Sequence, residues 1–72
     1  MSSTRDSILR TLRTRGPRAI SELAKDFGIT AASIRHHLAA LQAEGLVEAK
    51  EVRHGVGRPH LAYRLTDAAL ER

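Results

Sequence analysis

The spacing of hydrophobic residues changes once along the chain, at Gly45, and this change divides the sequence into a helical part and a hairpin part. Before Gly45, apolar residues recur at the intervals of amphipathic helices. After it, Leu61, Tyr63 and Leu65 alternate with other residues, as in a half-buried strand. With 72 residues and no cysteine, the chain has room for one domain held by one hydrophobic core and no disulfide.

Glycine residues mark the ends of the predicted helices. The first helix is expected from about Thr4 to Arg15, ending at Gly16-Pro17. Its apolar face consists of Ile8, Leu9 and Leu12. After a short extended link over 18–20, Ser21 is expected to cap the second helix, which ends at Gly28. The residues of the second helix expected to face inward are Leu23, Ala24 and Phe27.

A third helix is predicted from about Ala31 to Glu44, with Thr30 as its N-cap. Its inward residues, four and three positions apart, are Ile34, Leu38 and Leu41. Two short helices joined by a tight turn that contains glycine form a helix-turn-helix. The sequence therefore predicts this motif at about 20–45.

A two-stranded hairpin is predicted after the third helix, at about 46–65, with a basic, glycine-rich tip over 53–59. Such a hairpin beside a helix-turn-helix is called a wing, and we use the term for these residues. Thr66 is expected to cap a short last helix over 67–71. The predicted fold is α+β and mostly helical: a winged helix-turn-helix with a three-helix core and a two-stranded wing, forming one domain over 1–72.

Three residues within Ile20–Leu41 resemble the helix-turn-helix signature of bacterial transcription regulators. Ala24 stands at the small position of the first helix, Gly28 in the turn and Ile34 at the apolar anchor of the second helix. The run from Ala31 to Leu38, followed by Leu41 and the segment Glu44-Gly45-Leu46-Val47, is similar to the ArsR, MarR and DeoR-like winged-helix groups.

The end of the hairpin carries the most specific resemblance. Gly57-Arg58-Pro59 followed by Tyr63-Arg64-Leu65-Thr66 resembles winged-helix regulators in which an N-terminal DNA-binding domain precedes a sensor domain. The resemblance covers about 5–70 and implies binding of double-stranded DNA. Members that sense redox state use cysteine, which this chain lacks.

Arginine dominates the basic residues, with ten of the twelve, and the net charge is +4. Arginine binds phosphate and guanine edges in a planar fork, although an arginine-rich composition also arises from a GC-rich genome. Phe27 and Tyr63 are the only aromatic residues, too few for the stacking platforms of single-strand binding proteins. The charge therefore points to a polyanionic partner, with duplex DNA favoured over single strands.

The outward face of the third helix is the predicted reader of the major groove, which admits one α-helix. It consists of Ala32, Arg35, His36 and Ala39. Arg35 can form hydrogen bonds to guanine, and His36 can contact a base or a phosphate. The two alanines allow the helix to approach the DNA closely. His37, at the flank of the apolar face, is expected to pack or to bind a phosphate. The alternative is an ordinary solvated face, where alanine only favours helix formation.

Phosphate contacts are expected at the helix starts, where free N–H groups favour anions. The candidates are Ser21, Thr30 and Ser33, each also a capping or helix-start residue, together with Arg18 just before the second helix. In the wing, Arg53 and Arg58 are the candidates for the minor groove or the DNA backbone, over 53–60. Glycine and proline alone would indicate only a turn, but the basic residues around them indicate contact with DNA.

Metal binding and catalysis are not expected. His36 and His37 diverge by about 100° on a helix, His54 and His60 flank the wing tip, and neither pair has cysteine or clustered carboxylates nearby. The chain has no phosphate-binding glycine loop and no nucleophile with a base at a motif spacing. We therefore expect no enzyme, no cofactor and no small-molecule effector site within these residues.

Transcription regulation through double-stranded DNA is thus the predicted function, in the cytoplasm, because no segment has the length of a membrane span or the form of a signal peptide. A homodimer on a pseudo-palindrome is expected, with the first helix and the last short helix as available surfaces. Two alternatives remain. One is an architectural protein that coats DNA without sequence preference, and the other is a winged-helix module that binds proteins.

Overall fold

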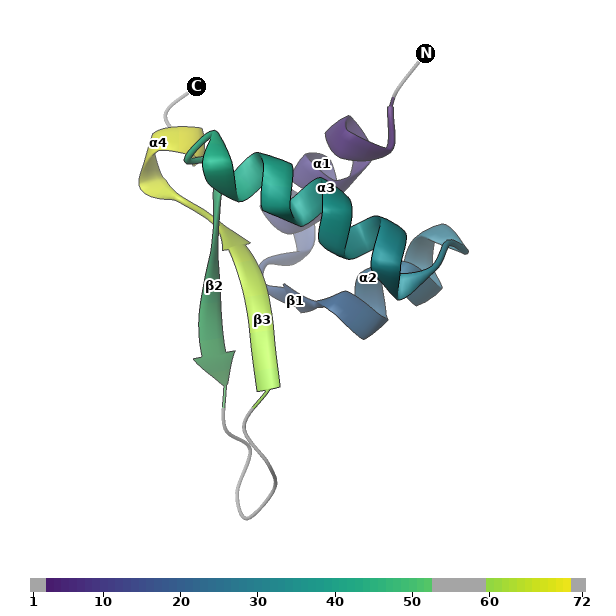
Figure 1. Ribbon diagram of the computed structural model, residues 1–72. Helices are drawn as coiled ribbons and strands as arrows, with labels where there is room; N and C mark the ends of the chain where they lie inside the picture. The colour runs from purple at the N-terminus through teal and green to yellow at the C-terminus, as the bar shows by residue number, and fades with distance from the viewer. Residues whose placement is uncertain (1–2, 53–59, 71–72) are drawn as a thin grey trace.

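The structure is a computed structural model that describes residues 3–52 and 60–70. Its elements follow the predicted order, including the short extended segment before the second helix. In chain order they are α1 (Thr4–Arg15), β1 (Arg18–Ala19), α2 (Ile20–Phe27), α3 (Ala31–Ala43), β2 (Val47–Val52), β3 (His60–Leu65) and α4 (Asp67–Leu70). Figure 1 shows the long β2–β3 hairpin extending away from the helices, with α3 in front of α1. The winged helix-turn-helix fold is thereby confirmed.

The sheet has three antiparallel strands in the order β1-β3-β2, so β3 is the central strand. The hairpin register pairs Val47 with Leu65 and Ala49 with Tyr63. On the other side of β3, Arg18 pairs with Tyr63. The predicted extended link before α2 is therefore a strand that fastens the helix-turn-helix to the base of the wing.

One hydrophobic core joins the three long helices to the base of the hairpin. α1 contributes Ile8 and Leu12, and α2 contributes Leu23. The remaining members from α3, the hairpin and α4 are Ile34, Leu38, Leu41, Leu46, Val47, Leu65 and Ala69. The predicted inward face of α3 is confirmed, because Ile34, Leu38 and Leu41 are all buried. On α1, Ile8 and Leu12 are buried as predicted, whereas Leu9 is only partly buried against the core.

The predicted alternation of β3 is wrong at its outer end. Leu61 is 50% exposed, whereas Ala62, expected on the outer face, is buried. Leu61 pairs with Glu51 near the distal part of the hairpin, beyond the reach of the helices. Ala62 lies on the central strand, with Ala19 and Lys50 as its partners on either side.

Helix ends are satisfied by specific polar groups. The Thr66 hydroxyl donates to the carbonyl oxygen of Gly45 at 2.6 Å and accepts from the backbone N–H of Ala69 at 3.2 Å. Thr66 therefore caps α4, as predicted, and also ties it to the turn between α3 and β2. Gly28 ends α2 in the left-handed conformation, with φ of 65°.

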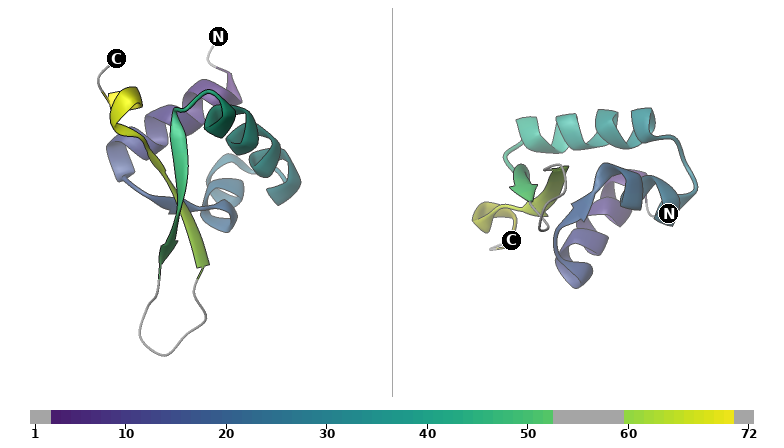
Figure 2. Two further views of the ribbon diagram at one scale, coloured as in Figure 1. Left: turned by 60° about the vertical axis from the view of Figure 1, so that its left-hand side comes forward. Right: turned by 90° about the horizontal axis from the view of Figure 1, so that it is seen from below.

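Seen from below, α3 runs along one side of the molecule, while α1 and α4 lie on the other side of the sheet base (Figure 2). The two helix sides therefore present separate surfaces. Within the described residues, no helix combines the length and apolarity needed to cross a bilayer.

Candidate nucleic-acid interface

The outward face of α3 is exposed along its length. Ala32, Ser33, Arg35, His36 and Ala39 are all exposed. α3 contains no acidic residue from Ala31 to Ala43. Because the inward positions are filled by aliphatic side chains, the helix can turn no other face to the solvent. The structure thus brings the predicted readers together on one uninterrupted face without carboxylates.

The start of α3 is held by a pair of hydroxyl groups. The Thr30 Oγ1 accepts from the backbone N–H of Ser33 at 3.1 Å and donates to the Ser33 Oγ at 3.1 Å. Thr30 is therefore the N-cap, as predicted. Both residues remain exposed beside the first turn of the helix. The cap leaves the earlier N–H groups of this turn for an anion, where the helix dipole favours negative charge.

The two adjacent histidines of α3 have different environments. His36 is exposed, while His37 is half-buried at the flank of the core. Their ring centroids lie 6.0 Å apart, with an edge-on interplanar angle of 68°. This arrangement agrees with the prediction that His37 packs partly against the protein while His36 projects outward.

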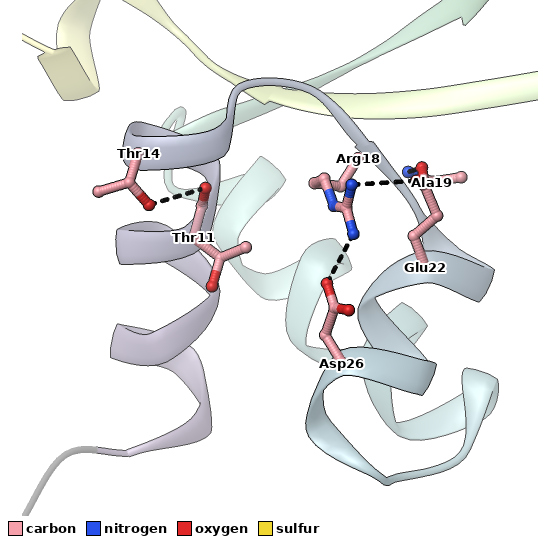
Figure 3. Close-up of polar contacts among 6 residues, drawn as sticks. All are labelled: Thr11, Thr14, Arg18, Ala19, Glu22 and Asp26. Carbon is pink, nitrogen blue, oxygen red and sulfur yellow. Dashed lines mark hydrogen bonds and ion pairs between the residues drawn. The ribbon is translucent and has the colours of Figure 1, made fainter.

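Arg18 forms an ion-pair cluster with two carboxylates of α2 (Figure 3). Its guanidinium lies 2.8 Å from Asp26 Oδ2 and 3.1 Å from Glu22 Oε2. The hydrogen bond to Asp26 raises the pKa of Arg18 above its ordinary value, and the charge of Glu22 acts in the same direction. With 22% of its side chain exposed, Arg18 fastens β1 to α2. Its predicted phosphate contact stays a prediction.

Ser21 is not the N-cap of α2, and that prediction is wrong. Helix α2 begins at Ile20, and Ala19 occupies the N-cap position. The side chain of Glu22 accepts a hydrogen bond from the backbone N–H of Ala19 at 2.9 Å. Pairing of Ala19 with Ala62 holds the backbone extended up to Ala19. The helix therefore begins at Ile20, before Ser21, and not after it. Ser21 is exposed in the first turn of α2.

Glu22 and Asp26 are charged partners of Arg18 that the sequence-based prediction did not include. They stand four residues apart on α2, at four and eight residues after Arg18. That spacing puts them on one helix face and was the available signal. The wing residues Arg53 and Arg58 lie outside the described residues, and their predicted DNA contacts stay predictions.

Comparison with known proteins adds an independent observation. The sequence over residues 2–49 matches the family described as "Bacterial regulatory protein, arsR family". This chain belongs to the arsR family. The match covers α1, the helix-turn-helix and the start of β2. No curated protein matches the chain in sequence.

Solved structures share the fold of this arsR-family chain. Stf76 from the Sulfolobus islandicus plasmid-virus pSSVx is 29% identical, with a TM-score of 0.80, and the match covers 99% of this chain and 96% of that one. A transcriptional regulator homologue from Pyrococcus horikoshii is 27% identical, with a TM-score of 0.79, covering 93% of this chain and 65% of that one. A MarR-like transcriptional regulator from Thermotoga maritima has 22% identity and a TM-score of 0.83, covering 99% and 49%.

Several of these neighbours are longer than this chain. It spans 48% of a second Thermotoga maritima transcriptional regulator and 47% of a MarR family regulator from Neisseria meningitidis. The arsR-family chain therefore corresponds to about half of such regulators. The matching family is described as regulatory proteins, and the solved structures that share the fold include transcriptional regulators.

Proposed function

We propose that this arsR-family domain regulates transcription by binding double-stranded DNA with sequence preference, placing α3 in the major groove. The observation that carries the proposal is the exposed face of α3, where Arg35 and His36 stand among small residues and no carboxylate interrupts them. A helix with its side chains is about 10–12 Å across, and the major groove of B-DNA is about 12 Å wide. The helix and the groove therefore match in size.

We assign base recognition to residues in the middle of α3. The guanidinium of Arg35 matches the O6 and N7 acceptors of guanine, the commonest specific contact in this groove. Ala32 and Ala39 let the helix approach closely and suit contact with a thymine methyl group. His36 reaches a base or a phosphate, and the half-buried His37 is placed for a phosphate at the groove edge.

Phosphate contacts orient the domain. Thr30 and Ser33 offer hydroxyl groups at the start of α3, and Ser21 offers one in the first turn of α2. Helix N-termini favour anions through their unpaired N–H groups. Such contacts fix register on the duplex without reading sequence.

The Arg18 cluster assists this surface indirectly. Glu22 and Asp26 lie on the helix that precedes α3, where free carboxylates would repel a phosphate backbone. Arg18 pairs with both. The two acidic side chains are thereby partly neutralised on the side of the helix-turn-helix that approaches DNA.

The wing supplies the second contact, through residues 53–60. Arg53 and Arg58 bind the adjacent minor groove or the DNA backbone, where arginine favours narrow, electronegative stretches. Because one module covers few base pairs, the protein acts as a homodimer on a pseudo-palindrome, with half-sites about one helical turn apart.

Selection of bound fragments from random duplex DNA tests this function. An enriched motif supports a sequence-specific regulator, and two-fold symmetry in that motif supports the dimer. Equal recovery of all sequences, with equal affinity for random and selected duplexes, would show an architectural protein instead. Absence of any duplex binding at low salt would contradict DNA binding altogether, because the phosphate contribution is strongest there.

A further inference from the structure

The charge of α3 depends on pH. Among the helices that the structure describes, α3 alone contains histidine. Arg35 supplies the one permanent charge of this helix, and His36 and His37 follow it directly. Histidine is the side chain whose charge changes between about pH 5 and 8. The helix proposed for the major groove therefore carries one positive charge at mildly alkaline pH and up to three at mildly acidic pH.

The ring nitrogens of both histidines are unused by the protein. Within the part of the chain that the structure describes, neither imidazole forms a hydrogen bond or an ion pair. His36 is exposed on the outward face of α3, and His37 is half-buried at its flank. Their centroids are 6.0 Å apart and their planes are inclined by 68°, so the rings are not stacked face to face. Each imidazole can therefore donate to a separate acceptor on DNA.

The carboxylates around α3 already have partners. The helix packs mainly against α1, α2 and β2. The acidic residues of these elements and of the turn after α3 are Asp6, Glu22, Asp26, Glu44, Glu48 and Glu51. Five of the six pair with Arg5, Arg18 or Arg64. The sixth, Glu51, lies opposite Leu61 near the outer end of the hairpin.

The remaining charged groups of these elements are positive. They are Arg10, Arg13 and Arg15 of α1, Lys25 of α2 and Lys50 of β2. Within the described residues, no unpaired carboxylate on α1, α2 or β2 therefore offsets the positive charge that α3 gains at lower pH. The negative charge that α3 then meets is that of the DNA phosphates.

We propose that α3 binds duplex DNA with His36 and His37 protonated, so that the affinity of the chain for DNA rises as the pH falls. This inference rests on the proposed function. A protonated imidazole donates from both ring nitrogens. At the major groove these donors meet phosphate oxygens and base acceptors. Because a nearby anion favours the protonated form, binding takes up protons, and a lower pH favours the bound state.

The proton would act here as an effector that needs no binding pocket. Its site is the DNA-reading helix itself, so regulation would require no separate sensor domain. Arg35 keeps its charge throughout this range and supplies binding that does not depend on pH. The two histidines then adjust the affinity around that constant contribution.

Fluorescence anisotropy of a labelled duplex, titrated with the full chain at about pH 6 and about pH 8 in the same salt, tests the proposal. We expect tighter binding at the lower pH, by about fivefold for each histidine whose protonated form DNA favours by about tenfold. His36→Gln should remove one such factor, and the double variant His36→Gln/His37→Gln should remove nearly all of the pH effect. The dependence of log affinity on log salt should be steeper at the lower pH, by about 0.9 for each additional phosphate neutralised.

Arg35→Gln is the matched control. It removes a permanent charge from the residue beside His36 on the same helix. Affinity should fall at both pH values, while the ratio between them should stay as in the wild type. Circular dichroism melting at both pH values shows whether each variant is folded, and the exposed His36 can be replaced without disturbing the core.

The outcomes separate this inference from the proposed function. Absence of duplex binding at both pH values would contradict the proposed function itself. Binding of equal affinity at both would overturn the proton linkage alone. A pH effect that persists in the double variant would assign proton uptake to residues outside α3, such as His54 or His60 of the wing. Weaker binding at the lower pH would show that DNA requires the neutral imidazole, the opposite of the proposal.

Discussion

The guanidinium of Arg18 in β1 donates a hydrogen bond to Asp26 Oδ2 in the last turn of α2, at 2.8 Å. Arg18 also pairs with Tyr63 across the sheet. One residue thus connects the central strand of the wing with the first helix of the helix-turn-helix. Because wing and helix-turn-helix are proposed to contact the same duplex, this connection fixes the angle between the two contacts.

Removing the Arg18 side chain should lower the thermal midpoint of the protein. Arg18→Ala leaves Glu22 and Asp26 facing each other without a cation, so like-charge repulsion adds to the lost pair. Asp26→Asn should lower the midpoint less, because Glu22 still pairs with Arg18. Circular dichroism melting of both single variants and of the double variant measures the coupling, and additive effects would contradict a shared cluster.

The contribution of Arg18 should not depend on pH in the neutral range. Its pKa is raised above the ordinary value by Asp26, so the stabilisation is complete below the ordinary arginine pKa and is lost only as the pH rises through the higher folded value. The stability difference between wild type and Arg18→Ala should therefore be equal at about pH 6 and about pH 9. Urea unfolding at both values measures it, and a difference that shrinks at the higher pH would contradict this assignment.

Two hydroxyl residues that look equivalent in the sequence should differ in their effect on stability. Thr30→Ala removes the side chain that accepts from Ser33 N–H and should cost about 1 kcal/mol of unfolding free energy. Ser21→Ala removes an exposed hydroxyl inside α2 and should change stability by less than about 0.5 kcal/mol. Urea denaturation of both variants compares them directly. A larger loss in Ser21→Ala than in Thr30→Ala would restore Ser21 as a cap.

A side chain at Gly28, in the turn of the helix-turn-helix, would have free space around it, but it would strain the backbone. A Cβ at Gly28 would meet no atom within 4 Å, yet the residue has φ of 65°. Gly28→Ala should therefore cost about 1–2 kcal/mol through the left-handed backbone alone. Gly28→Asn should cost less, because asparagine adopts this conformation more readily. Equal losses in the two variants, again by urea unfolding, would indicate a steric cause.

Local signals in the sequence were sufficient to predict the helices and the outward face of α3. Thr30, Gly28 and the aliphatic spacing of α3 act within a few residues, so the predicted cap, turn and outward face agree with the structure. The errors arose where distant segments decide. Ser21 lost its capping role because β1 pairs with β3, and Leu61 is exposed because the hairpin extends beyond the helices. Neither contact can be inferred from local spacing.

Replacement of Arg35 tests the proposed groove reader. Arg35→Ala should weaken binding to the selected DNA sequence by about 1–3 kcal/mol and relax preference at one base-pair position, because a bidentate contact to guanine is lost. Gln42→Ala, an exposed change near the other end of α3, is the control and should leave the preference intact. Anisotropy titrations on the selected duplex and on its single-base variants give both quantities. Uniform weakening on all sequences would assign Arg35 to a phosphate, and no change in either quantity would remove α3 from the interface.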